Sequence, residues 1–463
     1  MAARPPAARQ SNERLQALIQ EAGCSNAGLA RRVNVCGAEH GLDLRYDKTS
    51  VARWLRGQRP RGRAALVISE ALGRKLGRTV TLEEIGMDGV GGAASRVGLS
   101  FPHAVAAAVE QVCELWRCDA GRSGALCGPA GSVSVLVEPS RDWLVTPPDV
   151  HVARDAGARV GMSDVAAVRA TTCSLAQLDH RFGGGHVRPV VVHYLNSVVS
   201  GLLTGSYTEA VGRALFAAAA RLTELAGYTA LDTGRAGLAQ RCYVQALRLA
   251  QAADDRALGG YVLAAGMSHL AASLEDPREV AQLARTAQQG TRGLVTPRTL
   301  AMFCAAQARG HALTGDGRAF RECAGEALSA MEQAEAGAAT DGDPAWIAHF
   351  DRACLAGELA HCHRDLGRPR ETAERAEEAL AGCPPSRVRR RAVGLLLLAS
   401  AQAHMRELEH ACRTGTKAAE LLATLRSSLG CEYLEDLRRQ LVPFVKEPVV
   451  REFLARVDHL AMD

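Results

Sequence analysis

Helical segments of similar composition recur along the C-terminal half of the chain. They begin about 40 residues apart, with one interval of about 50 residues, and combine Ala and Leu with Glu, Gln or Arg at helical spacing. A repeat of this size is a pair of helices whose apolar face is buried only when the next pair stacks on it. The pattern predicts an α-helical solenoid over residues 205–463, with an irregular helical bundle as the alternative. The repeated segments are residues 238–247, 279–284, 319–328, 371–380 and 417–422.

The composition favours helices in the rest of the chain as well. Aromatic residues make up 4% of the 463 residues, whereas the hydrophobic fraction is 47%. Chains rich in Ala, Leu and Arg pack small-residue helices more readily than sheets. We therefore predict an all-α protein with several domains. One exception is expected, because Ser132–Val137 alternates in part and, with Asp142–Val145, predicts a small β-hairpin near residues 132–146.

A glycine-dense stretch marks the main expected boundary. Gly86–Ser95 predicts a hinge between the N-terminal helices and the remainder of the chain. We expect an N-terminal helical domain at residues 10–89 and a flexible linker at residues 90–102. A helical middle segment at residues 103–204, which contains the hairpin, then leads into the repeats at residues 205–463.

The N-terminal domain contains a short helix with two unlike faces. The Asp47–Arg61 sequence places a capping Asp before this helix and a Gly after its end. Val51, Trp54 and Leu55 share one face and can be buried. The opposite face carries short polar and cationic side chains, with an arginine cluster around its far end. Such side chains read base edges and neutralise phosphates, so the pattern is typical of a DNA-recognition helix. A solvated basic helix in a protein-binding module is the alternative.

The charge of the chain is distributed unevenly. Residues 1–80 hold 13 arginines and 2 lysines against 6 acidic residues, a net charge of +9, whereas the whole chain carries +5. The remainder therefore carries −4. A basic domain attached to a mildly acidic body indicates a polyanionic partner for that domain.

The N-terminal domain resembles the Xre/Cro-type helix-turn-helix family. The resemblance rests on Ala27–Ala30, whose Leu-Ala pair packs on the recognition helix, and on Ser50–Gly57 with Pro60, which contain a Trp-x-x-Gly segment. The sequence departs from the family at residues 34–46, where a longer second helix or an inserted loop replaces the usual tight turn. The resemblance implies a DNA-binding domain of helix-turn-helix fold. It implies base contacts from Lys48, Thr49, Ser50 and Arg53, and phosphate contacts from Arg56, Arg59, Arg61 and Arg63.

The C-terminal repeats resemble tetratricopeptide repeats, most closely at Gly367–Ala373 and Glu378–Leu380, although their interval exceeds the usual length of about 34 residues. The two parts together, in a chain rich in Ala, Arg and Gly, are similar to actinobacterial Xre/Cro-type regulators of the NsdA kind with a C-terminal tetratricopeptide-like domain. Such regulators govern development and antibiotic biosynthesis.

The resemblance implies a sequence-specific transcriptional regulator that binds double-stranded DNA. Because one short helix reads few base pairs, we expect a homodimer. The repeat groove is expected to hold a peptide, a protein or a small molecule. The alternative is a helical-repeat interaction adaptor that does not bind DNA.

Catalytic, metal and membrane signatures are not expected. The chain lacks the Gly-x-Ser-x-Gly, Walker and Ser-x-x-Lys motifs, so we expect neither an enzyme nor a cofactor. The histidines of His361–His363 lie two residues apart on an expected helix, which is unsuitable for zinc. The 14 cysteines follow no secretory signal, and the longest apolar run, Leu395–Ala399, is too short to span a bilayer. We therefore expect reduced thiols and a cytoplasmic location.

Overall fold

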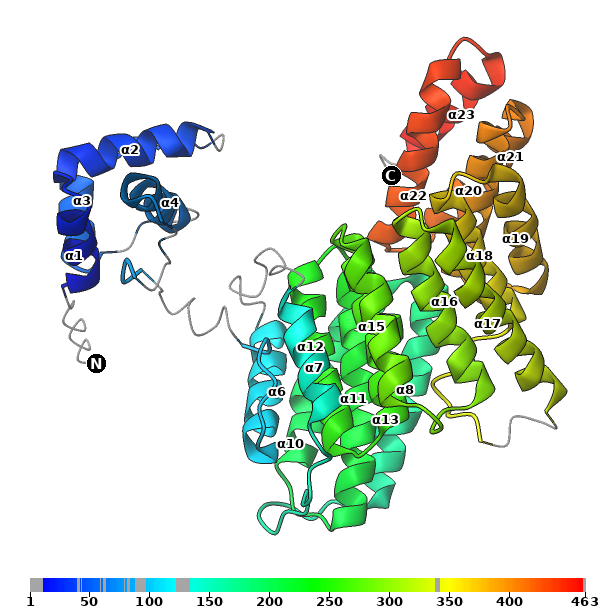
Figure 1. The fold of residues 1–463 in the computed structure, drawn as a ribbon, viewed down its shortest axis with the longest axis horizontal. Coiled ribbons are helices and arrows are strands. Elements are labelled where there is room, and N and C mark those ends of the chain that lie inside the picture. The colour runs from blue at the N-terminus through cyan, green and yellow to red at the C-terminus, as the bar shows by residue number, and fades with distance from the viewer. Residues whose placement is uncertain are drawn as a thin grey trace, which may run out of the picture. The chain divides into compact units, whose positions relative to one another are not determined.

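The chain forms two compact units, residues 1–96 and 97–463, each with its own buried apolar residues (Figure 1). The described residues are largely α-helical and contain no strand, only two isolated β-bridges, Arg154–Tyr207 and Arg159–Ser206. The all-α prediction is confirmed. The computed structural model describes residues 11–39, 42, 44–58, 60, 64–78, 80, 84–87, 97–121, 134–337 and 342–460.

The N-terminal unit packs short helices around one small core. Asn12 joins three of its parts, because its Oδ1 accepts from the Leu15 N–H at 3.0 Å and its Nδ2 donates to the Ile85 carbonyl at 2.8 Å. The backbone N–H of Asn12 also donates to the carbonyl of Leu55 at 2.8 Å. The first helix is thus capped and tied to both later segments. The helices described in this unit are α1 (Glu13–Glu21), α2 (Asn26–Glu39), α3 (Lys48–Leu55) and α4 (Ala64–Leu76).

The connection between α2 and α3 is held against the second helix by one side chain. α2 continues to Glu39, so a longer second helix accounts for part of the departure at residues 34–46. The Nδ2 of Asn34 donates to the carbonyl of Tyr46 at 2.9 Å, and its Oδ1 accepts from the Tyr46 N–H at 2.8 Å. The Tyr46 ring meets Trp54 edge to face, with ring centroids 4.9 Å apart. These contacts fix the start of α3 on α2.

The C-terminal unit is built from consecutive helix pairs, which Figure 1 shows stacked in chain order from green to orange. α11 packs on α12, α16 on α17, α18 on α19 and α20 on α21, and α15 also packs on α16. This succession of neighbouring pairs is the arrangement of a helical solenoid. The helices are α6 (Val105–Ala120), α7 (Ser134–Val145), α8 (Met162–Phe182), α9 (Gly184–Tyr194), η2 (Leu195–Val199), α10 (Ser200–Leu203), α11 (Glu209–Leu231), α12 (Ala236–Ala252), α13 (Arg256–Tyr261), η3 (Val262–Met267), α14 (Ser268–Ser273), α15 (Pro277–Gly290), α16 (Pro297–Leu313), α17 (Gly317–Ala336), α18 (Arg352–Asp365), α19 (Pro369–Gly382), α20 (Val388–His404), α21 (Leu408–Leu422), α22 (Ser428–Leu441), η4 (Val442–Phe444) and α23 (Pro448–Leu460).

The predicted β-hairpin near residues 132–146 is wrong, because residues 134–145 form the helix α7. Leu136, Ser140 and Trp143 are buried and fall four and three residues apart, which is one face of a helix. A Cβ built on Gly259 would lie 2.4 Å from the Trp143 ring, so this glycine leaves the space in which the indole packs. The alternating residues indicated a strand, but the period of the buried side chains decided the structure. Residues 132 and 133 lie outside the described residues.

The described end of the expected linker, residues 97–102, and the middle segment belong to the same compact unit as the repeats, and long polar side chains of α12 attach both of them. Gln245 donates to the carbonyls of Gly98 and Ser100 at 3.0 and 2.9 Å. Gln251 donates to the carbonyls of Thr146 and Pro147 at 2.8 and 2.7 Å. These bonds join α12 to backbone carbonyls on both sides of α6 and α7.

Candidate functional site

The start of α3 is defined by a capping box. The Asp47 carboxylate accepts from the backbone N–H and the hydroxyl of Ser50, both at 2.8 Å. The hydrogen bonds from Ser50 lower the pKa of Asp47. The Ser50 hydroxyl is therefore engaged in holding the helix end, although the sequence assigned it to base contacts.

The remaining residues of α3 divide into a buried and an exposed face, as the sequence indicated. Val51 and Trp54 are 0% and 4% exposed and belong to the core of the N-terminal unit, and Leu55 is half-buried against it. The expected base-contact residues Lys48, Thr49 and Arg53 are exposed, as is Arg56 at the C-terminal end of the helix. The expected phosphate-contact residues Arg59, Arg61 and Arg63 lie outside the described residues.

Cations of the N-terminal unit fall into two groups. Arg74 pairs with Glu39 and Glu70 at 2.5 and 2.6 Å, and Arg78 pairs with Glu84 at 2.7 Å. Among the described residues, Lys48 and Arg53 form no ion pair. The positive charge of α3 is thus not neutralised by a neighbouring carboxylate within the described structure.

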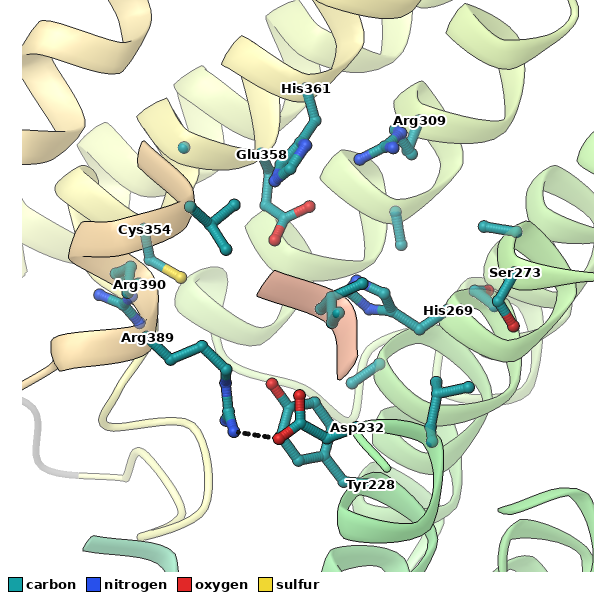
Figure 2. A pocket seen from close by; sticks show the side chains of 18 of the residues that line it. Tyr228, Asp232, His269, Ser273, Arg309, Cys354, Glu358, His361, Arg389 and Arg390 are labelled. Atoms are coloured by element: carbon teal, nitrogen blue, oxygen red, sulfur yellow. Dashed lines mark hydrogen bonds and ion pairs between the residues drawn. The ribbon is translucent and has the colours of Figure 1, made fainter. Parts of the chain in front are cut away.

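The C-terminal unit holds a second candidate site, a cavity of about 620 Å³ on the inner side of the helix pairs (Figure 2). It is lined by the first helix of successive pairs: α11, α14, α16, α18 and α20 all contribute, and α8 and α22 add further residues. Short side chains leave the space open, including Ala264 and Ala265 on the π-helical turn η3. A turn of this kind rotates the residues that follow it, and it frequently occurs at functional sites.

One wall of the cavity is a buried ionic network centred on Arg389. Its guanidinium donates to Asp179 at 2.7 Å and to Asp232 at 3.0 Å, and it lies over the Tyr228 ring, 4.8 Å from its centroid. Burial alone would lower the pKa of Arg389, but Tyr228 and the two carboxylates raise it well above its usual value. Asp232 also accepts from the Ser427 hydroxyl at 2.6 Å. Because Arg389 bonds to carboxylates from two other helices, it serves mainly to join α8, α11 and α20.

The cavity histidines are held in the neutral form. Burial, followed by nearby arginines, lowers the pKa of His180 to about 2 and that of His349 to about 3. The same causes lower the pKa of His361 well below its usual value, and its Nδ1 lies 3.0 Å from the Tyr433 hydroxyl. At neutral pH these rings contribute hydrogen bonding rather than charge.

The cysteines and histidines of the described chain do not converge on a metal site. No group of three or more His, Cys, Asp or Glu among the described residues is placed to hold a metal ion. Burial raises the pKa of the Cys354 thiol at the cavity to about 12, so this thiol remains protonated. No helix in the described parts of the chain is long and apolar enough to cross a membrane.

Most of the cavity residues could not be recognised from the sequence. They come from positions between Ala176 and Asp436 and have no common spacing. One signal was present, because Arg387 and the run Arg389–Arg391 form a dense cationic group outside the basic N-terminal domain.

The fold defines an all-α protein in which a small basic unit is followed by a helical solenoid. Residues 15–88 match the family described as the SP15 N-terminal domain. The match begins within α1, includes α2, α3 and α4, and covers none of the C-terminal unit. No curated protein matches the chain.

Proposed function

We propose that this protein is a sequence-specific transcriptional regulator whose N-terminal unit binds double-stranded DNA through α3. The observation that carries the proposal is the exposed face of α3, where Lys48 and Arg53 form no ion pair among the described residues. Trp54 and Val51 anchor the opposite face in the core. A short helix fixed in this way presents cations to a polyanion without cost to its own packing.

The clamp on the connection before α3 supports the same role. Base readout requires the reading helix to keep its position on the rest of the domain. Asn34 and Tyr46 provide this through two hydrogen bonds of 2.9 and 2.8 Å. We assign base contacts to Lys48, Thr49 and Arg53, and phosphate contacts to Arg56 with Arg59, Arg61 and Arg63.

The C-terminal unit is assigned the role of sensor and dimerisation platform. One helix of eight residues reads too few base pairs for a genomic site, so two copies of the chain should read a palindrome. The cavity of about 620 Å³ has the size of a small-molecule site and gives the sensor a place to bind its signal. Such a regulator acts in the cytoplasm on chromosomal DNA, and the resemblance stated above points to development or antibiotic biosynthesis as the regulated process.

The experiment is a selection of duplexes from a random library with the full-length protein, followed by binding assays on the selected and scrambled sequences. Arg53→Ala should reduce the preference for the selected sequence, because it removes a base contact. Arg56→Ala should lower the affinity for both sequences alike, because it removes a phosphate contact. Arg318→Ala, which removes an exposed arginine of α17, is the matched control and should change neither.

Enrichment of no duplex would contradict the proposal. It would favour instead an interaction adaptor whose N-terminal unit binds protein. Equal loss of preference in Arg53→Ala and Arg56→Ala would contradict the assignment of roles within α3.

A further inference from the structure

The start of α20 places a partly unpaired cationic pair in the cavity wall. Arg387 and Arg390 both line the cavity, one turn apart. The Nη1 atom of Arg387 is buried and has no hydrogen-bond partner among the described residues. A buried guanidinium nitrogen without a partner carries a large desolvation cost, so it indicates a site where a ligand supplies the missing acceptor.

The nearby carboxylates act mainly on Arg390 and leave the Nη1 atom of Arg387 without a partner among the described residues. Arg390 donates to the His349 carbonyl at 3.1 Å and lies 3.6 Å from Asp351. Asp351 is the carboxylate that acts on both Arg387 and Arg390, whereas Asp179 and Asp232 bond to Arg389. Glu358, which also lines the cavity, acts on Arg390 as well, so Asp351 is the carboxylate that the structure gives to Arg387 and it is shared with Arg390.

The other groups beside Arg387 carry no negative charge. His180 and His349 lie beside the pair and are neutral, because burial and the arginines lower the pKa of each ring. The Cys354 thiol is protonated, since burial raises its pKa to about 12. Figure 2 shows Cys354 beside Arg390 on the same wall. The corner thus combines fixed positive charge with neutral hydrogen-bonding groups.

The larger part of the cavity lining is apolar, which suits a ligand with an apolar body. The apolar lining includes Ala264, Ala265, Met302, Ala306, Val393 and Leu397, and Arg309, Glu358 and Glu432 add charged groups of both signs. A volume of about 620 Å³ far exceeds that of an inorganic anion and lies in the range of sites for organic molecules. An anionic head on an apolar body would match both parts of the lining.

We propose that the cavity binds an amphiphilic organic anion, a carboxylate or phosphate ester, with its head group on Arg387 and Arg390 and its apolar body against the alanine-rich wall. This inference names the ligand class for the sensor role and to that extent rests on the proposed function. Its test contains no DNA, so it can fail while duplex binding holds, and the reverse is equally possible.

The test uses two dyes that differ in one charged group. The first is 8-anilino-1-naphthalenesulfonate, and the second is N-phenyl-1-naphthylamine, which lacks the sulfonate. Fluorescence titration of the full-length protein should show one saturable site for each dye. Arg387→Gln should lower the affinity for the sulfonate dye by about tenfold or more, because it removes a charge-assisted hydrogen bond. It should leave the affinity for the uncharged dye unchanged. Arg387→Lys should restore part of the loss, and Arg318→Gln should have no effect.

Competition then identifies the head group. Decanoate and decyl phosphate are added separately against the bound sulfonate dye, with inorganic phosphate as the third competitor. Displacement by one or both of the long-chain anions, at concentrations where inorganic phosphate has no effect, supports the proposal and shows which head group is preferred. Displacement by inorganic phosphate at equal concentration would overturn the apolar part of the proposal.

Two further outcomes would overturn the assignment to this corner. One is unchanged affinity of Arg387→Gln for the sulfonate dye. The other is an equal loss for both dyes in a variant whose circular dichroism and melting temperature match the original protein, since such a loss would not depend on the charge of the ligand.

Discussion

At the scale of single residues, the side chain of Asn34 holds the start of α3 in place on α2. The side-chain amide of Asn34 donates to the carbonyl of Tyr46 and accepts from its N–H. These two bonds join α2 to the connection before α3. Asn34→Ala should lower the stability of the connection by about 2 kcal/mol, because two polar backbone groups lose their partners. Hydrogen exchange of peptides covering residues 44–55 should accelerate, and affinity for the selected duplex should fall.

Gln16→Ala, at an exposed position of α1, is the control for that substitution. Unchanged exchange in Asn34→Ala would show that the loop is held by the Tyr46 and Trp54 rings alone.

Buried neutral histidines give the C-terminal unit a dependence on pH. The pKa values of His180 and His349 are about 2 and about 3 in the folded chain, below the value of about 6.5 of an unfolded histidine. Between the folded and the unfolded pKa of each histidine, the unfolded state therefore binds more protons than the folded state. The contribution of the histidines to stability is complete above about pH 6.5 and is lost as the pH falls through the window toward about pH 3.

Urea unfolding at several pH values in that window measures the effect. Each histidine contributes a slope of at most about 1.4 kcal/mol per pH unit. His349→Gln should make the stability fall less steeply with decreasing pH, whereas His410→Gln replaces an exposed histidine and serves as the control. An unaltered slope in His349→Gln would mean that this ring can take up a proton without unfolding.

At the scale of elements, substitution of two glycines on neighbouring helices distinguishes the effect of helix packing on stability from the effect of helix propensity. A Cβ on Gly310 of α16 would lie 2.4 Å from the backbone nitrogen of Ala281 on α15, whereas a Cβ on Gly325 of α17 would meet nothing within 4 Å. Gly310→Ala should destabilise the C-terminal unit by about 2 kcal/mol, because the two helices must move apart. Gly325→Ala should stabilise it by up to about 1 kcal/mol, because Ala favours the helix. Thermal unfolding of both variants measures this, and equal shifts would contradict the close approach of α15 and α16.

Elements could be predicted where periodicity and burial agree. The repeated segments 319–328 and 371–380 lie in α17 and α19, where apolar spacing of the helical period continues over several turns. The β-hairpin predicted near residues 132–146 rests on a local alternation, whereas residues 134–145 form a helix with Pro139 inside it. Trp143 of this helix packs against Gly259, a contact between positions that no local pattern connects.

At the scale of the whole molecule, the two candidate sites differ in how far the sequence predicts them. The α3 site is continuous in sequence, so its buried and exposed faces could be assigned from Val51, Trp54 and Arg53 alone. The engagement of Ser50 in the capping box could not be separated from a base contact without the geometry. The cavity is assembled from helices far apart in the chain, and the unpaired Nη1 of Arg387 appears only after those helices pack.

The central claim is that the protein binds duplex DNA through a basic N-terminal unit, and the salt dependence of binding tests it most directly. The measurement is fluorescence anisotropy of a selected duplex with the full-length protein and with Arg53→Ala. With about four phosphate contacts, affinity should fall about a hundredfold between about 50 and 200 mM salt. Arg53→Ala should bind more weakly but keep that slope, because Arg53 is assigned to a base rather than to a phosphate. Absence of duplex binding at low salt, or affinity that does not change with salt, would contradict the account.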